Sequence, residues 1–219
     1  MIWLTLYTIF VLMIGLLYQF PSWMQRMYRG VTWRRHGTRV VYLTFDDGVI
    51  PEVTPAILDI LRDEQVKATF FVVGDNVRKY PDIYRRLIAE GHRVGNHTMH
   101  HTKGTKVSLS EYMADVEACQ NVLGEGRSNL FRPPYGKMTF AQKRALLDAG
   151  YEIILWDVLT HDYNPRFSPE KMLRIVQTYT RDGSIINFHD SVKSGERTIA
   201  ALPMAIRWLK ENGWRMEVL

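Results

Sequence analysis

The chain has 219 residues, 46% of them hydrophobic, which is enough for one domain with a substantial core. Its single cysteine, Cys119, excludes an intramolecular disulfide. The net charge of +5 resides in a basic arm that precedes Asp46, because the remainder of the chain has 23 basic and 23 acidic residues. No recognition motif accompanies this arm, so we expect no nucleic-acid partner.

Residues 2–20 contain no charged side chain and approach the roughly 20 residues that a membrane-spanning helix needs. We predict an N-terminal membrane anchor over residues 1–20, with a helix packed on the domain or a stretch that is not part of the working protein as the alternatives. The uncharged start and the bulky residues before Pro21 do not fit a cleaved secretory signal.

A basic connecting arm is predicted over residues 21–37, followed by a catalytic domain over residues 38–219. By the positive-inside rule, the arginines of the arm place this domain at the cytoplasmic face of a membrane. An envelope-facing protein and a soluble cytoplasmic protein are the alternatives.

The segment from Val40 to Gly48 is an apolar, β-branched run that ends in two carboxylates and a glycine. Apolar residues on both alternating faces predict a strand buried on both sides, as in a parallel α/β sheet. Asp46 and Asp47 can share one site only if the pleat of the strand breaks there, which Gly48 permits. On its own, the pair is equally compatible with an Asp-Gly turn.

Helical and strand patterns alternate along the rest of the chain. Helices are predicted over residues 52–65, 81–90, 109–123, 140–149, 169–181 and 198–212. Further strands are predicted at residues 68–73, 92–96, 130–132, 151–157, 184–189 and 214–219. Seven strands alternating with six helices predict a parallel sheet that forms a barrel or a distorted barrel. The chemistry-bearing motifs all follow strand ends, so we expect them to share one site.

Five motifs, in this order, resemble those of the NodB-type polysaccharide deacetylases, carbohydrate esterase family 4. They are Thr44-Phe45-Asp46-Asp47-Gly48, Gly95-Asn96-His97-Thr98-Met99-His100-His101, Phe131-Arg132-Pro133-Pro134-Tyr135-Gly136, Leu155-Trp156-Asp157 through Asp162, and Ile185-Ile186-Asn187-Phe188-His189-Asp190. The resemblance covers about residues 38 to 219. It implies an α/β fold of the deformed (β/α)7-type barrel class, the NodB homology domain, here preceded by an N-terminal apolar helix.

The resemblance implies one divalent metal ion. Two imidazoles and a carboxylate form the ligand set of a catalytic zinc-like site, with positions left for water and substrate. By helical spacing alone, His97 is adjacent to both His100 and His101. The family pattern His-(Ser/Thr)-x-x-His selects His97 and His101, with Asp47 as the third ligand. Zinc, cobalt or a similar first-row ion suits this set.

Catalytic roles also follow from the resemblance. Asp46 corresponds to the general base, and Arg132 to the residue that holds this base ionised and aimed. Tyr135 corresponds to the residue whose backbone N–H stabilises the oxyanion. His189 corresponds to the general acid that protonates the departing amine, with Asp162 orienting it.

Substrate contacts are implied for Pro133, Pro134, Trp156 and Asn187, with core packing as an equal alternative for Trp156. Asn187 stands where the family usually has leucine, and strand alternation places it on the same face as His189. We expect its amide to face the acyl group. The result would be a slower deacetylase, or one that accepts a smaller or more polar acyl group such as formyl.

The leading functional prediction is N-deacetylation of an N-acetylated amino sugar in a glycan. One alternative is a deacylase of a small or lipid-linked sugar at the membrane surface, and another is a catalytically silent carbohydrate-binding relative. All five motifs carry their reactive residues, which favours an enzyme. We expect an acetylated amino-sugar glycan or glycolipid as substrate, membrane association through the N-terminus, and a monomer.

Overall fold

The computed structural model describes Gln19, Gln25 and residues 28–219. The predicted N-terminal apolar helix and membrane anchor lie outside the described residues, apart from Gln19. Within the described ranges, no helix is long and apolar enough to cross a membrane.

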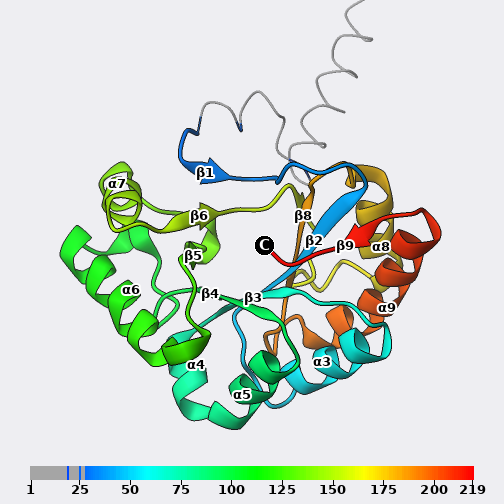
Figure 1. The fold of residues 1–219 in the computed structure, drawn as a ribbon, viewed down its shortest axis with the longest axis horizontal. Coiled ribbons are helices and arrows are strands. Elements are labelled where there is room, and N and C mark those ends of the chain that lie inside the picture. The colour runs from blue at the N-terminus through cyan, green and yellow to red at the C-terminus, as the bar shows by residue number, and fades with distance from the viewer. Residues whose placement is uncertain (1–18, 20–24, 26–27) are drawn as a thin grey trace, which may run out of the picture.

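The described chain forms one curled sheet of parallel strands with helices around its outer side (Figure 1). The strand order is β1-β6-β5-β4-β3-β2-β8-β7, and β9 pairs with the first residues of β2. Because β1 and β7 end this order, the barrel is deformed, as the sequence predicted. The strands are β1 (Val31–Thr32), β2 (Val40–Asp46), β3 (Thr69–Val72), β4 (Arg93–Asn96), β5 (Leu130–Phe131), β6 (Glu152–Ile154), β7 (Val158–Leu159), β8 (Ile185–His189) and β9 (Arg215–Met216).

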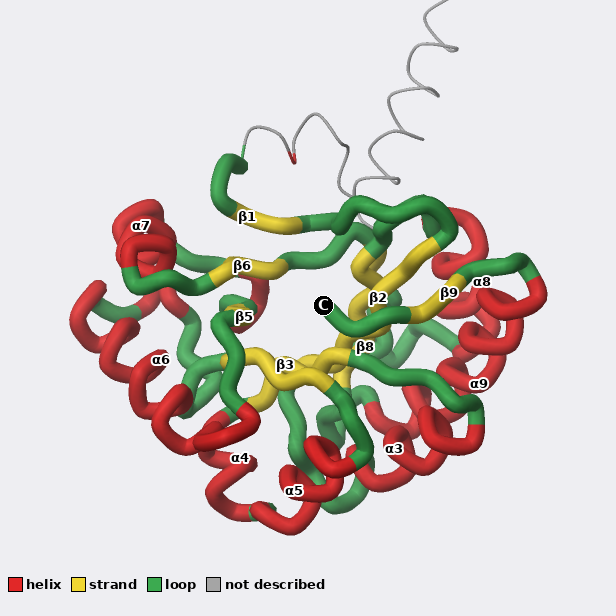
Figure 2. Tube along the Cα trace, viewed as in Figure 1, coloured by secondary structure: helices red, strands yellow, loops and turns green. Residues whose placement is uncertain are grey.

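The six predicted helices are confirmed with small shifts at their ends, and Figure 2 shows them outside the strands. They are α3 (Thr54–Asp63), α5 (Pro81–Ala89), α6 (Leu109–Leu123), α7 (Phe140–Asp148), α8 (Pro169–Tyr179) and α9 (Gly195–Glu211). The sequence did not predict the short helix α4 (Gly74–Lys79). The strand that it predicted over residues 151–157 covers β6 but ends before β7, which was not predicted.

Local signals fix two of the helix starts. Ser108 before α6 and Thr139 before α7 each form a capping box, with Glu111 and Gln142 respectively. These side chains bond main-chain N–H groups that have no partner inside the helix. The two helices therefore begin where the sequence predicted.

Side-chain alternation along β2 separates two cores. Val41, Leu43 and Phe45 pack in the large cluster between the sheet and the helices. Val40 and Tyr42 belong to a smaller cluster inside the barrel, with Leu219. Figure 1 accordingly shows the C-terminus in the middle of the ring of strands. The end of the chain thus fills the amino end of the barrel and leaves the carboxyl end for a pocket.

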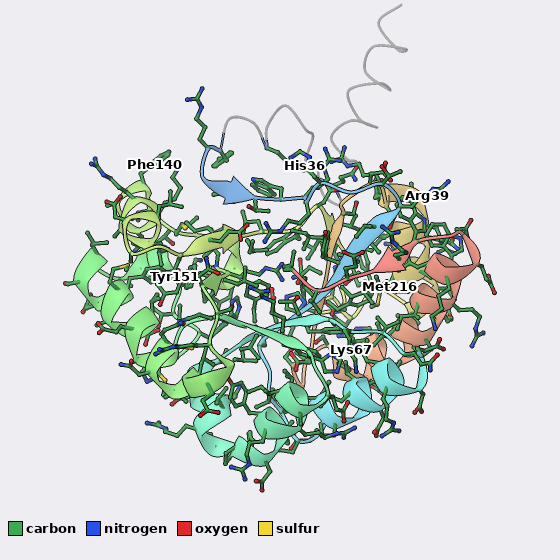
Figure 3. All side chains as sticks on the ribbon, in the orientation of Figure 1. His36, Arg39, Lys67, Phe140, Tyr151 and Met216 are labelled. Carbon is green, nitrogen blue, oxygen red and sulfur yellow. The ribbon has the colours of Figure 1, made fainter. Side chains whose placement is uncertain are left out.

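The second half of the basic arm is part of the barrel. β1 pairs with β6, and Arg35 binds Glu152 of β6 at 2.8 Å. The guanidinium of Arg39 lies 4.9 Å from the centre of the Trp214 ring. Figure 3 labels His36 and Arg39 along this edge. Residues 31–37, predicted as a connecting arm, therefore lie against the catalytic domain.

Candidate active site

The register between β2 and β8 brings distant motifs together. Asp46 pairs with His189, and Thr44 pairs with Asn187, so the two strands end side by side. A pocket of about 640 Å³ opens at this end of the barrel. Its walls are Asp46, Asp47, His97, His101, Lys103, Tyr135, Lys137, Trp156, Leu159, Tyr163, His189, Ser191 and Lys193. This arrangement agrees with the prediction that the motifs share one site.

The pleat of β2 breaks at Asp47 rather than at Gly48. Asp47 has a φ of +86°, a conformation that is uncommon for a residue with a side chain. This turn allows both carboxylates to face the pocket. Gly48 is needed for a different reason, because a Cβ there would lie 1.8 Å from Oδ2 of Asp190.

Asp47, His97 and His101 form the one group of potential metal ligands found among the described residues. Their ligand atoms all lie within 4.8 Å of one another. Nε2 of His101 is 3.1 Å and Nε2 of His97 is 3.6 Å from Oδ1 of Asp47. Nδ1 of His97 lies 2.7 Å from the carbonyl of Arg132, which leaves Nε2 as a free ligand atom when Nδ1 donates.

The donor set therefore fits a divalent cation. Burial disfavours the charged form of Asp47, but hydrogen bonds with His101 and His97 outweigh it and hold the pKa well below its usual value. An ionised carboxylate and two imidazoles suit zinc or cobalt. His100 lies outside this group, because its ring is paired with Asp115 and largely exposed.

Asp46 is held by a buried polar network. Nη1 of Arg132 donates to Oδ1 of Asp46 at 2.6 Å, and the Asn187 amide donates to Oδ2 at 3.0 Å. The same Nη1 also contacts Oδ1 of Asn187 at 2.6 Å. The Thr44 hydroxyl donates to this amide oxygen at 2.9 Å. Both oxygens of the Asp46 carboxylate are thereby fixed in direction.

Asn187 does not face the pocket as the sequence predicted. Its side chain is fully buried beneath Asp46, and it is not part of the pocket wall. Strand alternation does place Asn187 on the same inner face as His189. Asn187 comes two residues earlier in β8, however, and so lies deeper in the barrel, where it pairs with Thr44. The predicted contact with the acyl group is thus replaced by contacts with Asp46, Arg132 and Thr44.

His189 stands beside Asp46 in the pocket and is oriented by Asp162. Nδ1 of His189 lies 2.7 Å from Oδ1 of Asp162, whose Oδ2 accepts a hydrogen bond from Thr198 at 2.8 Å. Burial disfavours the charged imidazole, but the Asp162 carboxylate raises the pKa of His189 to about 10. A protonated His189 can donate a proton to a leaving group.

Two of the other predicted residues reach the pocket and two do not. Tyr135 and Trp156 line it, and the Tyr135 ring lies 4.7 Å from that of His101. Tyr135 has a φ of +60° within the turn that Pro134 begins. Pro133 and Pro134 are buried outside the pocket wall, so they shape this turn instead of lining the cavity.

Asp190 was not singled out from the sequence. Its buried carboxylate accepts the N–H of Gly48 at 2.8 Å and the hydroxyl of Thr54 at 2.7 Å. Burial raises its pKa to about 7. It therefore fixes the loop that carries the two acids. Its position directly after His189 is the only sequence signal for this role.

The lysines of the pocket and Tyr163 were also missed as pocket residues. The Tyr163 ring packs edge-on against His189, with ring centres 5.4 Å apart. Lys103, Lys137 and Lys193 come from loops whose paths the sequence does not reveal.

Comparisons with known proteins agree with this geometry. The family described as "Polysaccharide deacetylase" matches residues 34–154. A peptidoglycan-N-acetylglucosamine deacetylase of Bacillus cereus is 32% identical over 192 residues, covering 84% of this chain and 89% of the relative. A chitooligosaccharide deacetylase of a Bradyrhizobium strain is 34% identical over 198 residues, covering 84% of this chain and 90% of the relative.

Solved structures share the fold. The crystal structure of a peptidoglycan N-acetylglucosamine deacetylase superposes with a TM-score of 0.84 at 32% identity, covering 91% of this chain and 95% of that one. A carbohydrate esterase family 4 pseudoenzyme from Bacillus anthracis has a TM-score of 0.78 at 26% identity, covering 86% of this chain and 67% of that one. Because one of these neighbours is a pseudoenzyme, activity has to be argued from the residues in the pocket.

Proposed function

The chain belongs to the polysaccharide deacetylase family and is a hydrolase of non-peptide carbon–nitrogen bonds, and from this premise we propose that it removes the N-acetyl group from an N-acetylglucosamine-type residue of a glycan. One observation carries the proposal. An acid fixed by Arg132 and a protonated histidine fixed by Asp162 end neighbouring strands, beside the Asp47, His97 and His101 cluster.

Asp47, His97 and His101 would hold the divalent ion. When bound, such an ion supplies Lewis-acid activation of water and of the amide carbonyl. The remaining steps belong to side chains of the pocket. Asp46 accepts a proton from the attacking water, because Arg132 and Asn187 aim its carboxylate into the pocket while keeping it away from bulk solvent.

Collapse of the tetrahedral species releases acetate and an amine. The backbone N–H of Tyr135 is the proposed donor to the oxyanion, since its turn lies directly against His101. His189 gives its proton to the amine nitrogen and is held in the required orientation by Asp162. Trp156 and Tyr163 form walls against which a sugar ring can pack.

The proposal is tested with acetylated chitooligosaccharides by measuring free acetate and free amine. We expect equal amounts of both, loss of activity on chelation, and recovery when zinc or cobalt is returned. His97→Ala should lose the metal, whereas His100→Ala, a matched change outside the ligand group, should retain it. Release of neither product from any acetylated amino sugar by the metal-loaded protein would leave the silent relative as the better description.

The two neighbouring acids should behave differently. Asp46→Asn should keep the metal and lose turnover, because an amide cannot accept the proton. Asp47→Asn should lose metal affinity, because it replaces the charged ligand by a neutral one. Metal content by elemental analysis and acetate release separate the two effects. Metal loss with retained activity in Asp46→Asn would reverse their roles.

A further inference from the structure

Three lysines stand around the pocket on three different loops. Lys103 precedes the short 3-10 helix η1 (Gly104–Lys106), Lys137 follows the turn η3 (Pro134–Gly136), and Lys193 lies between β8 and α9. We propose that they form an anion-binding subsite and that the substrate is an amino-sugar glycan carrying a carboxylate or phosphate next to the acetylated sugar. This inference rests on the deacetylase function proposed above.

The charge balance of the pocket leaves these lysines uncompensated. Among the described residues, Asp46 and Asp47 are the only acids in the pocket wall. Asp46 is neutralised by Arg132, and Asp47 faces two histidines and the proposed cation. None of the three lysines forms an ion pair in the part of the chain that the structure describes. Their positive charge is therefore available to a ligand.

One of the three ammonium groups is placed close to the chemistry. Nζ of Lys103 lies 5.6 Å from the centre of the Tyr135 ring, whose own centre is 4.7 Å from that of His101. A cation over an aromatic face is attracted by the ring. Lys103 therefore lies in the pocket wall beside Tyr135, next to the ligand group.

The positive charge of the three lysines should make the pocket prefer anionic substrates. A cleft lined by charges of one sign concentrates ligands of the opposite sign and raises their association rate. Three ammonium groups beside a divalent cation also repel one another, and the amine product adds a further positive charge. A neutral glycan relieves none of this repulsion, whereas a carboxylate or phosphate on the neighbouring sugar does.

The test compares substrates that differ only in charge. One pair is an N-acetylated disaccharide with a carboxylate on the neighbouring sugar and the same compound with that carboxylate as an amide. The second pair carries a phosphate or an uncharged hydroxyl at one position. We expect kcat/KM for acetate release to be about tenfold higher for at least one anionic member at low salt, and the ratio to fall with salt because exposed charges are screened. The pair that shows the preference identifies the anion.

Substitutions then locate the effect. Lys103→Gln, Lys137→Gln and Lys193→Gln, singly and combined, should lower the anionic-to-neutral ratio stepwise toward one. The ratio is taken within each variant, so a partly folded preparation does not alter it. Lys67→Gln is the matched control. Lys67 is exposed just before β3, at the opposite end of the barrel, and is labelled in Figure 3. Its ratio should equal that of the parent.

Two results would overturn the inference. One is equal kcat/KM for both members of both pairs, and the other is an anionic preference that persists in the triple variant. In either case the neutral substrates would still release acetate, so the proposed deacetylase function would stand. Failure of that function would instead appear as no acetate from any of the four substrates.

Discussion

Arg132 has no exposed surface, and all of its guanidinium nitrogens have hydrogen-bond partners inside the protein. Nε donates to the carbonyl of Ile154 at 3.3 Å, and Nη2 donates to the carbonyl of Leu155 at 3.1 Å. Nη1 donates to Oδ1 of Asp46. The cation also lies 4.0 Å from the centre of the Phe71 ring. A buried charge is tolerated only when it is paired and hydrogen-bonded in this way. The direction of Asp46 thus depends on buried residues that lie outside the pocket wall.

The first prediction concerns Asn187→Leu, which restores the residue usual in the family. Leucine cannot donate to Oδ2 of Asp46, so the carboxylate loses one of its two fixed contacts. A hydrogen bond to a charged group is worth about 1.5–3 kcal/mol, so we expect kcat to fall about ten- to a hundredfold with little change in KM. Steady-state kinetics with metal analysis measure this effect.

The same variant tests the acyl contact that the sequence suggested. Because Asn187 lies beneath Asp46, the ratio of kcat/KM for N-acetyl and N-formyl substrates should remain unchanged. In an Asp46→Asn background, Asn187→Leu should cause no further loss of residual activity. A changed acyl ratio with unchanged kcat would instead return Asn187 to the acyl pocket.

The second prediction concerns pH. The Asp162 carboxylate raises the pKa of His189 to about 10, so the imidazole stays protonated up to that pH and loses its proton above it. Activity that needs this proton should fall as pH rises. Asp162→Asn removes the cause of the shift and should move the alkaline limb of kcat to lower pH.

Asp115→Asn is the matched control, because Asp115 pairs with His100 outside the pocket. Its alkaline limb should coincide with that of the parent protein. If the limb of Asp162→Asn also stayed in place, His189 would not be the proton donor.

The ligand and acid–base residues could be predicted because a motif records residue type and order. The orientation of Asn187 could not, since it depends on the register with Thr44 and on depth below the pocket. Asp190 escaped prediction for a similar reason. Its partner Thr54 begins a helix far away in the sequence, and only the folded chain brings the two together.

At the scale of the element, the loop after β2 is fixed by close packing. Gly48→Ala would push a methyl group into the Asp190 carboxylate, which must then leave Thr54 or the Gly48 N–H. Such overpacking costs about 1–3 kcal/mol, and we expect most of the activity to be lost with it. Urea unfolding and acetate release measure the two effects.

Gly150→Ala serves as the comparison. Gly150 has a φ of +83° and open space where a Cβ would stand, so alanine there is strained but clashes with nothing. A residue forced into the left-handed region costs about 1–2 kcal/mol. This variant should lose similar stability and keep its kcat. Equal activity in both variants would show that the Asp190 contact does not position the two acids.

The helices were predictable because each carries an apolar stripe and a recognisable start over at least nine residues. β1 and β7 have two residues each, which is too short for any periodic pattern. They are strands only because β6 and β8 lie beside them. Tertiary pairing, rather than local sequence, therefore determines the two edges of the sheet.

At the scale of the whole molecule, Gln19 and Gln25, the described residues before Tyr28, bind residues near the amino ends of β7 and β8. Asp157 is fully buried and binds Arg181 and the Ser184 hydroxyl, the latter at 2.8 Å. Nε2 of Gln25 donates to the same carboxylate at 2.9 Å. Gln19 donates to the carbonyl of Tyr179 at 2.7 Å. Because Gln19 contacts the barrel, an N-terminal anchor would have to end before it.

The last prediction separates anchoring from folding. A chain that begins at residue 28 lacks both glutamines, so Asp157 loses amide donors, and we expect about 1–2 kcal/mol less free energy of unfolding in urea. Its kcat/KM should be unchanged, because Asp157 precedes β7 and its buried side chain is not part of the pocket wall. Gln19→Ala with Gln25→Ala in the full chain should reproduce the stability loss.

We propose that residues before Gln19 anchor the protein, so this double variant should sediment with membranes while the shortened chain does not. Equal soluble recovery of both would remove the anchor, and equal stability of parent and shortened chain would show that the arm contributes nothing to the fold.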